Sequence, residues 1–260
     1  MTVQERLAAL RSLMKEKHVD AYLVPTDDFH GSEYVGDYFK CRKYITGFTG
    51  SAGTAVITSD MAGLWTDGRY FIQAAQQLEG TTVTLFKMGE PKVPTVHEFL
   101  KDKLTEGMCL GFDGRCVSAA EAEELKSLLA DKNISFSVED DLIGEIWKNR
   151  PELSCEPVME LEEKWAGKSR ADKCAQIRDK MAEKGADAFI LTSLDDIAWL
   201  LNIRGNDIHC CPVVLSYLVM TQDEILLFAN EKAFDTAVRN SLEKDGVVLK
   251  PYNDIYQYVK

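Results

Sequence analysis

The chain has 260 residues, of which 45% are apolar and 28% are charged, so its composition is that of a globular protein with one large or two ordinary domains. Its formal net charge of −12, without any basic run, excludes general binding to nucleic acid, because phosphate contacts require clustered Lys and Arg. The first residues lack the order of a signal peptide, and no apolar run approaches the ~18 residues of a membrane helix. We expect a cytoplasmic protein with no nucleic-acid or membrane partner.

Seven cysteines are scattered along the chain without a C-x-x-C pair of zinc-site spacing. This pattern favours reduced thiols that act as small apolar side chains. The run His209-Cys210-Cys211 is a poor chelate, because adjacent side chains on a strand point to opposite faces. No metal site is therefore expected from the cysteines.

The first elements are a helix and a strand. Val3, Leu7, Leu10 and Met14 have the spacing of one helical face up to about residue 17, and residues 20–25 form a short apolar strand. A glycine-rich stretch follows at 44–70. There the sequence predicts strands at 55–57 and 63–66 around a turn, then a helix over 68–78. Its inward side chains are expected to be Phe71 or Ile72, Ala75 and Leu78.

Helices and strands continue to alternate after residue 80. Strands are predicted at 82–86, 109–112 and 134–138, and helices from Thr95, over 118–129 and over 141–148. This alternation is typical of a layered α/β domain. Two prolines and weak periodicity then indicate an extended linker. We therefore divide the chain into a first domain (1–150), a linker (151–160) and a second domain (161–260).

The second domain starts like the first. A helix over 171–184 and a strand over 187–191 repeat the first unit, and seven positions are identical when Asp187 is set on Asp20. This matching favours two copies of one domain. The identical pairs are Ala8/Ala175, Arg11/Arg178, Met14/Met181, Glu16/Glu183, Lys17/Lys184, Asp20/Asp187 and Ala21/Ala188.

Further elements of the second copy are a helix at 195–201, strands at 213–220 and 224–228, a helix at 233–242 and a strand at 246–249. Residues 255–260 then end the sequence without a helix cap or stop signal. We expect the natural protein to continue, with the second domain truncated at its end.

The glycine loop is the first candidate site. Its spacing Gly47-x-x-Gly50-x-x-Gly53 fits neither nucleotide-binding motif, and it leads into a strand rather than a helix N-terminus, which disfavours a phosphate site. Close packing of the loop on neighbouring backbone is the favoured interpretation. Ser51 lies in no nucleophile elbow, and no histidine is placed to form a triad with it.

Polar clusters are the second candidates. The density of carboxylates and histidine around His30, and again at 206–209, suggests a divalent ion, but solvated loops have the same composition. Asp195 is better interpreted as a favourable charge at a helix N-terminus. Arg69 and Arg204 each follow a turn signal, where an arginine either binds a carboxylate bidentately or clamps its own chain. No convincing catalytic set is found.

Two long motifs resemble a known family. The stretch 44–55, read with Trp65-Thr66-Asp67-Gly68-Arg69-Tyr70-Phe71, closely resembles the amino-terminal domain of long-form Xaa-Pro aminopeptidases. The likeness continues through 87–89 and 146–151, and in the second copy through 194–208 and 211–213. It covers nearly the whole chain.

The resemblance implies two creatinase/prolidase-type amino-terminal domains, each a mixed β-sheet covered by helices, before a "pita-bread" metallopeptidase domain. In that family the catalytic domain holds two divalent ions, Mn²⁺ or similar, on Asp, His and Glu ligands. None of those motifs occurs here, so this chain is expected to be inactive alone, with no cofactor of its own. The parent enzyme would act on proline-containing peptides, contact these domains through its catalytic domain and form a homodimer.

The resemblance also leaves a set of candidates for substrate binding or an interface. They are Phe48, Asp67, Arg69, Tyr70, Arg204 and Asp207. Two alternatives stay open: a stand-alone interaction or small-molecule-binding module, and the amino-terminal part of a prolidase or creatinase-like hydrolase.

Overall fold

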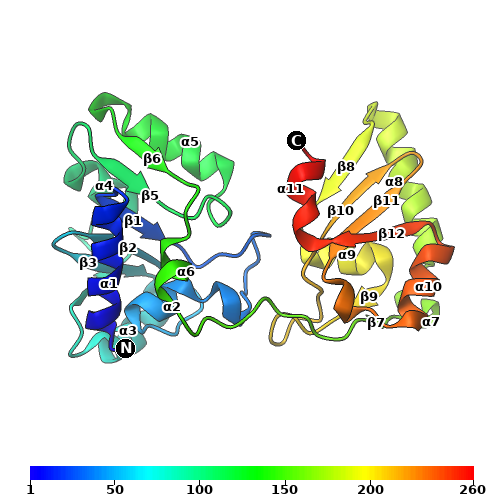
Figure 1. The fold of residues 1–260 in the computed structure, drawn as a ribbon, viewed down its shortest axis with the longest axis horizontal. Coiled ribbons are helices and arrows are strands. Elements are labelled where there is room, and N and C mark those ends of the chain that lie inside the picture. Colours follow the sequence, from blue (N-terminus) through cyan, green and yellow to red (C-terminus); the bar gives the residue numbers. More distant parts are fainter. The chain divides into compact units, whose positions relative to one another are not determined.

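A computed structural model describes all residues from 1 to 260 and divides them into two compact units (Figure 1). The first unit holds residues 1–29 and 38–152, and the second holds residues 30–37 and 153–260. Each unit has its own β-sheet and its own apolar core.

The first unit alternates helices and strands as expected. Its helices are α1 (Val3–Glu16), α2 (Cys41–Thr46), α3 (Phe71–Leu78), α4 (Val96–Lys103), α5 (Ala119–Leu128) and α6 (Leu142–Ile146), with short 3₁₀ turns η1 (Asp37–Phe39), η2 (Gly68–Tyr70) and η3 (Ala130–Lys132). Its strands are β1 (Ala21–Val24), β2 (Thr54–Thr58), β3 (Ala62–Thr66), β4 (Val83–Lys87), β5 (Cys109–Gly111) and β6 (Ser135–Ser137).

The six strands form one mixed sheet in the order β4-β3-β2-β1-β5-β6. Strand β2 pairs antiparallel with both β1 and β3, and every other pairing is parallel. Five strands therefore run in one direction, and only β2 runs against them. The carboxyl ends of those five strands meet at one edge of the sheet, together with the loop that enters β2.

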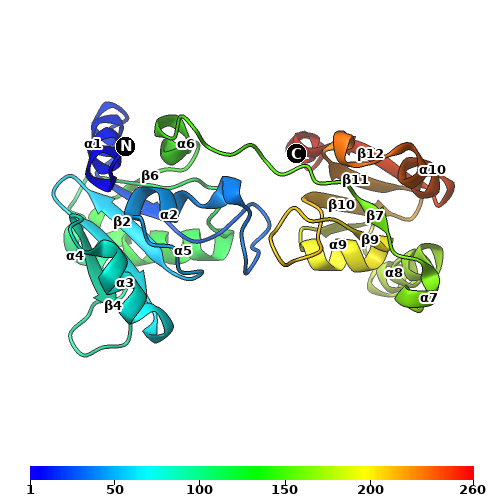
Figure 2. The same cartoon turned by 90° about the horizontal axis from the view of Figure 1, so that it is seen from below.

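Both faces of this sheet are covered, as Figure 2 shows. The period of two along a strand sends Tyr22 and Val24 of β1 into a core with α1, α2, α3 and α6. Ala21 and Leu23 point to the opposite face, where a second core includes residues of α4 and α5. A sheet buried on both faces needs apolar residues in succession, which explains why β1 reads as an unbroken apolar run.

The second unit has a smaller sheet. Its strands are β7 (Met159–Glu160), β8 (Ala188–Leu191), β9 (Ile203–Arg204), β10 (Ser216–Thr221), β11 (Ile225–Ala229) and β12 (Val247–Pro251). Its helices are α7 (Glu163–Ala166), α8 (Arg170–Lys184), α9 (Leu194–Leu201), α10 (Thr236–Lys244) and α11 (Ile255–Tyr258), with 3₁₀ turns η4 (Glu231–Ala233) and η5 (Tyr252–Asp254). Four strands pair in the order β12-β11-β10-β8, while β7 and β9 form a separate ribbon.

The two sheets share one plan. In both, the first strand pairs antiparallel with the second, the second antiparallel with the third, and the third parallel with the fourth. The shared elements are α1, β1, α2, β2, β3, α3 and β4 in the first unit and α8, β8, α9, β10, β11, α10 and β12 in the second. The predicted fold class, two related mixed α/β domains, is confirmed.

The repeat extends to single hydrogen bonds. The Arg11 Nε atom donates to the carbonyl oxygen of Thr58 at 2.9 Å, and the Arg178 Nε atom donates to that of Thr221 at 3.0 Å. Thr58 pairs with Ala21 in one sheet, as Thr221 pairs with Ala188 in the other. The identical arginines found in the sequence therefore tie helix to sheet in the same way in both units.

Two sequence expectations differ from the structure. The sequence division placed residues 30–37 in the first domain, but they group with the second unit, where His30 contacts Thr192 and Tyr252. Helix α3 buries Ala74 and Leu78, while Ile72 is 78% exposed and Ala75 is also exposed. The inward position expected for Ala75 is thus wrong, and of the alternatives Phe71 and Ile72 only Phe71 is partly buried, while Leu78 is buried as expected.

Candidate functional site

A binding site in the first unit is expected at the edge where the five parallel strands end. In open α/β sheets the loops at the carboxyl ends of the strands carry the ligand-binding side chains. Strand β3 is followed there by Asp67-Gly68-Arg69-Tyr70, and Asp113-Gly114-Arg115 comes shortly after β5. The glycine loop 47–53 reaches the same edge because it leads into the antiparallel strand β2.

A buried arginine holds the glycine loop from within. Arg42 of α2 is only 4% exposed, and its guanidinium donates to the Phe48 carbonyl oxygen at 2.7 Å and to the Gly50 carbonyl oxygen. Its Nε atom donates to the Thr26 hydroxyl at 3.0 Å. All three acceptors are neutral, so burial lowers the pKa of Arg42 to about 10. This role of Arg42 could not be predicted from the sequence, because its partners are mostly backbone atoms.

Close contacts explain two of the glycines. A Cβ atom on Gly50 would collide with the Phe48 ring and lie 2.8 Å from the Tyr70 ring. A Cβ atom on Gly53 would lie 2.9 Å from the backbone oxygen of Trp65. The Thr66 hydroxyl donates a hydrogen bond to the Ala52 carbonyl oxygen of the loop at 2.8 Å. Its carbonyl oxygens thus point to donors inside the protein, in a packed loop rather than an open anion cradle.

The predicted residues Asp67, Arg69, Tyr70 and Phe48 lie together. The Arg69 Nε and Nη2 atoms each donate to the Asp67 carboxylate at 2.9 Å, and the backbone N–H of Arg69 donates to the same carboxylate at 3.0 Å. The guanidinium lies 5.3 Å from the centre of the Tyr70 ring, which meets the buried Phe48 ring edge-on at 5.8 Å. The Tyr70 hydroxyl is 2.6 Å from the Ser51 hydroxyl.

The same Asp-Gly-Arg clamp occurs after β5. The Arg115 backbone N–H, Nε and Nη2 atoms each lie 3.0 Å from Asp113 carboxylate oxygens. The Arg115 guanidinium then covers the Phe29 ring at 4.3 Å. Sequence reasoning missed this second clamp, although the recurrence of Asp-Gly-Arg after two predicted strands was a visible signal.

Arg204 and Asp207 belong to the second unit and point into their own fold. The Arg204 Nη1 atom donates to the carbonyl oxygens of Ala198 and Ile203 at 2.7 and 2.8 Å. Asp207 is buried and accepts from the backbone N–H groups of Glu156 and Leu215 at 3.0 and 2.8 Å. Asp207 thereby fixes the segment that leads into the second unit.

Histidine positions do not assemble a metal centre. His30 is buried, with Nδ1 3.1 Å from the Thr192 carbonyl oxygen and Nε2 2.7 Å from the Tyr252 hydroxyl. His209 and Cys210 are exposed. No group of three or more His, Cys, Asp or Glu side chains is arranged to hold a metal ion.

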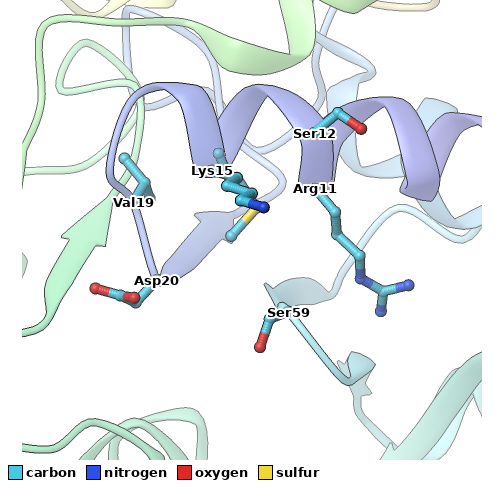
Figure 3. Close-up of a pocket in the computed structure, with 7 residues that line it drawn as sticks. Arg11, Ser12, Lys15, Val19, Asp20 and Ser59 are labelled. Carbon is cyan, nitrogen blue, oxygen red and sulfur yellow. The ribbon is translucent and has the colours of Figure 1, made fainter.

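Each unit also has an open depression. One, of about 390 Å³, lies beside α1 and is lined by Arg11, Lys15, Asp20 and Ser59 among others (Figure 3). The other, of about 530 Å³, lies at the carboxyl ends of β11 and β12. In the depression beside α1, the Arg11 side chain already donates a hydrogen bond to the Thr58 carbonyl oxygen, and the Asp20 carboxylate points away from Arg11. Its mixed charges favour no single ligand class.

The fold and the edge define a class of protein: a duplicated, mixed α/β domain without nucleotide-binding loops. Residues 6–142 match the model of the creatinase/prolidase N-terminal domain, and residues 149–260 match a second model with the same description. The chain therefore belongs to the creatinase/prolidase N-terminal domain family.

Its relatives are longer than the chain. A Coprinopsis cinerea protein named "Probable Xaa-Pro aminopeptidase P" is 42% identical over 98% of the chain, which covers 41% of that protein. "Aminopeptidase P2" of Arabidopsis thaliana is 40% identical over 99% of the chain, which covers 37% of it. The chain thus spans about two fifths of the length of these relatives.

A solved structure agrees with the sequence relatives. The crystal structure of X-prolyl aminopeptidase from Caenorhabditis elegans, described as a cytosolic enzyme with a di-nuclear active site, superposes with a TM-score of 0.93 at 36% identity. The match covers all of this chain and 44% of that one. Among the helices of this chain, none is long and apolar enough to cross a membrane.

Replacing Arg42 with Met should lower the free energy of unfolding by about 3 kcal/mol, because the carbonyl oxygens of Phe48 and Gly50 lose buried charged donors. Urea denaturation followed by circular dichroism measures the change. Lys43→Met is the matched control, since Lys43 is exposed on the same helix. Equal midpoints for the two variants would contradict the role given to Arg42.

The Arg69 guanidinium holds the pKa of the Asp67 carboxyl at about 2, below its ordinary value. A pKa depressed in the folded state stabilises the fold above the unfolded-state pKa of about 3.9, and that contribution disappears as the pH falls through about 2. We expect carbon-detected NMR titration to show Arg69→Ala raising the pKa of Asp67 toward 3.9, with Arg69→Lys in between. An Asp67 that titrates near 3.9 in the unaltered protein would disprove the clamp in solution.

Proposed function

We propose that this chain is the non-catalytic amino-terminal part of a Xaa-Pro aminopeptidase, an enzyme that removes the first residue of peptides with proline second. One observation carries the proposal: about 40% identity runs along nearly the whole chain to proteins of that name, and 36% to the C. elegans enzyme. The share of those proteins left uncovered has room for a separate catalytic domain.

The chemistry would then lie outside residues 1–260. A di-nuclear centre in the rest of the parent enzyme would supply Lewis-acid chemistry for hydrolysis of the peptide bond, and we infer that the two ions are Mn²⁺. The side chains present here do not fit such a centre, because no group of three or more ligand-type residues is brought together. No step of the hydrolysis is therefore assigned to this chain.

The edge built on Asp67, Arg69 and Tyr70 would help to shape substrate access or to join subunits. Arg69 is 67% exposed in its side chain, and it is held in one direction by Asp67 rather than left to sample many rotamers. Ile72 and Met88 are also exposed. Met88 lies near the clamp, because its backbone N–H donates to the carbonyl oxygen of Thr66, the residue before Asp67. A fixed cation beside exposed apolar side chains is the composition of an interface.

The other predicted residues take supporting roles in this proposal. Phe48 packs beneath Tyr70, while Arg204 and Asp207 order the second unit. We also infer a cytoplasmic location and a homodimeric parent enzyme. The location is supported by the cytosolic description of the C. elegans enzyme.

The division of labour can be tested by peptide hydrolysis. Residues 1–260 should show no turnover of an X-Pro peptide with added Mn²⁺, while a chain of the relatives' full length should hydrolyse it. Liquid chromatography of the released amino acid measures both. Metal-dependent turnover by residues 1–260 alone would refute the proposal.

The role of the exposed clamp can be tested in the full-length enzyme. Arg69→Ala should lower kcat/KM for an X-Pro peptide about tenfold or shift the oligomeric state measured by light scattering, because the fixed cation is lost. Lys148→Ala, another exposed basic residue of the first unit, is the control and should change neither. If Arg69→Ala also leaves both unchanged, the clamp serves only the fold.

A further inference from the structure

The 3₁₀ turns η2 and η4 are equivalent elements of the two repeats. Strands β3 and β11 have the same length, and each pairs in parallel along its whole length with the next strand of its unit. Asp67 directly follows β3, and Asn230 directly follows β11. Each is the N-cap of the 3₁₀ turn after it, so Arg69 and Lys232 occupy the same place two residues on. The edge described in the first unit therefore has a counterpart in the second.

The two caps hold their cations differently. The Asp67 carboxylate accepts from the backbone N–H of Arg69 and also from its Nε and Nη2 atoms. The Asn230 side chain accepts only from the backbone N–H of Lys232, at 3.2 Å, because an uncharged amide attracts an ammonium far less than a carboxylate does. Lys232 is exposed, and its ammonium forms no ion pair or hydrogen bond within the chain. The cation of the second unit is thus open to a ligand.

The depression of about 530 Å³ at the carboxyl ends of β11 and β12 lies beside this cation. Figure 1 shows this end of the sheet, where α11 follows β12. The volume is within the range of roughly 300–1,000 Å³ that is typical of small-molecule sites. One ammonium, from Lys232, and two carboxylates, from Glu231 and Asp254, are the charged groups of the lining. Its apolar part comes from Leu153, Leu215, Ala229, Pro251 and Tyr252.

These charges favour one kind of ligand. A phosphate or another polyanion would meet two carboxylates and only one ammonium, so repulsion disfavours it. A metal ion is disfavoured as well, because no group of three or more His, Cys, Asp or Glu side chains is arranged to hold one. A molecule with one carboxylate and one ammonium can pair each of its charges with an opposite charge of the lining.

We propose that this depression binds a small zwitterion with an apolar side chain, either a free amino acid or a dipeptide. Lys232 binds the carboxylate of the ligand, and Asp254 and Glu231 receive its ammonium. The apolar side chain of the ligand lies against the apolar lining. The site lies entirely within the second unit and includes no hydrolytic step, so it stands apart from the aminopeptidase role proposed above.

NMR titration of isotope-labelled residues 1–260 with glycyl-leucine and with leucine tests the site. We expect saturable shifts of the backbone amides at 229–232 and 252–254, and the probe with the lower Kd tells a dipeptide site from an amino-acid site. N-acetylation removes the ammonium of each probe and amidation removes its carboxylate, so either change should raise Kd roughly tenfold or more. The absence of saturable shifts with both probes would overturn the proposal. Equal Kd values for the charged and blocked forms would do the same.

Substitutions at the cation and its cap separate binding from folding. Lys232→Met should raise Kd roughly tenfold, whereas Lys244→Met, at an exposed lysine outside the depression, should leave Kd unchanged. Binding that Lys232→Met leaves unchanged would contradict the proposal.

Asn230→Asp is the second variant, and it decides the matter if Lys232→Met lowers the thermal midpoint. It keeps an N-cap side chain and gives Lys232 the kind of carboxylate partner that Arg69 has, so binding should weaken although the fold is retained. Unchanged or tighter binding by Asn230→Asp would show that Lys232 does not hold the carboxylate of the ligand.

Discussion

A guanidinium buried under the glycine loop is the interaction on which the edge of the first sheet depends. Arg42 takes up the carbonyl oxygens of Phe48 and Gly50, so the loop can close tightly without leaving buried acceptors unpaired. The closed loop presses Phe48 against Tyr70, which in turn carries Arg69. The buried Arg42 therefore helps to position the exposed Arg69, through contacts between the loop that enters β2 and the loop that leaves β3.

The duplication explains why such different stretches of sequence give one architecture. Each copy needs an amphipathic helix tied to a strand turn, and Arg11 and Arg178 supply that tie with the same hydrogen bond. The turn residues are also equivalent, because Thr58 and Thr221 both accept a backbone N–H three residues on. The two copies differ on the side of β1 that faces away from β2: there the first sheet continues with β5 and β6, whereas β8 is the last strand of the second sheet.

Both units match models of the creatinase/prolidase N-terminal domain, in agreement with the sheet plan that they share. In both Asp-Gly-Arg clamps a carboxylate holds the neighbouring arginine through its Nε and Nη2 atoms, which restricts the rotamers of that side chain.

The sequence by itself determined what depends on neighbouring residues: the helix starts at Thr95 and Ser118, the apolar run of β1, the repeat anchored on Asp20 and Asp187, and the family motifs around Tyr44 and Arg69. Only the tertiary structure decided the role of Arg42, because its acceptors are mostly backbone carbonyls that leave no side-chain signature in the sequence. It also placed residues 30–37 in the second unit and turned Ile72 outward. Both depend on contacts distant in sequence, which local periodicity does not encode.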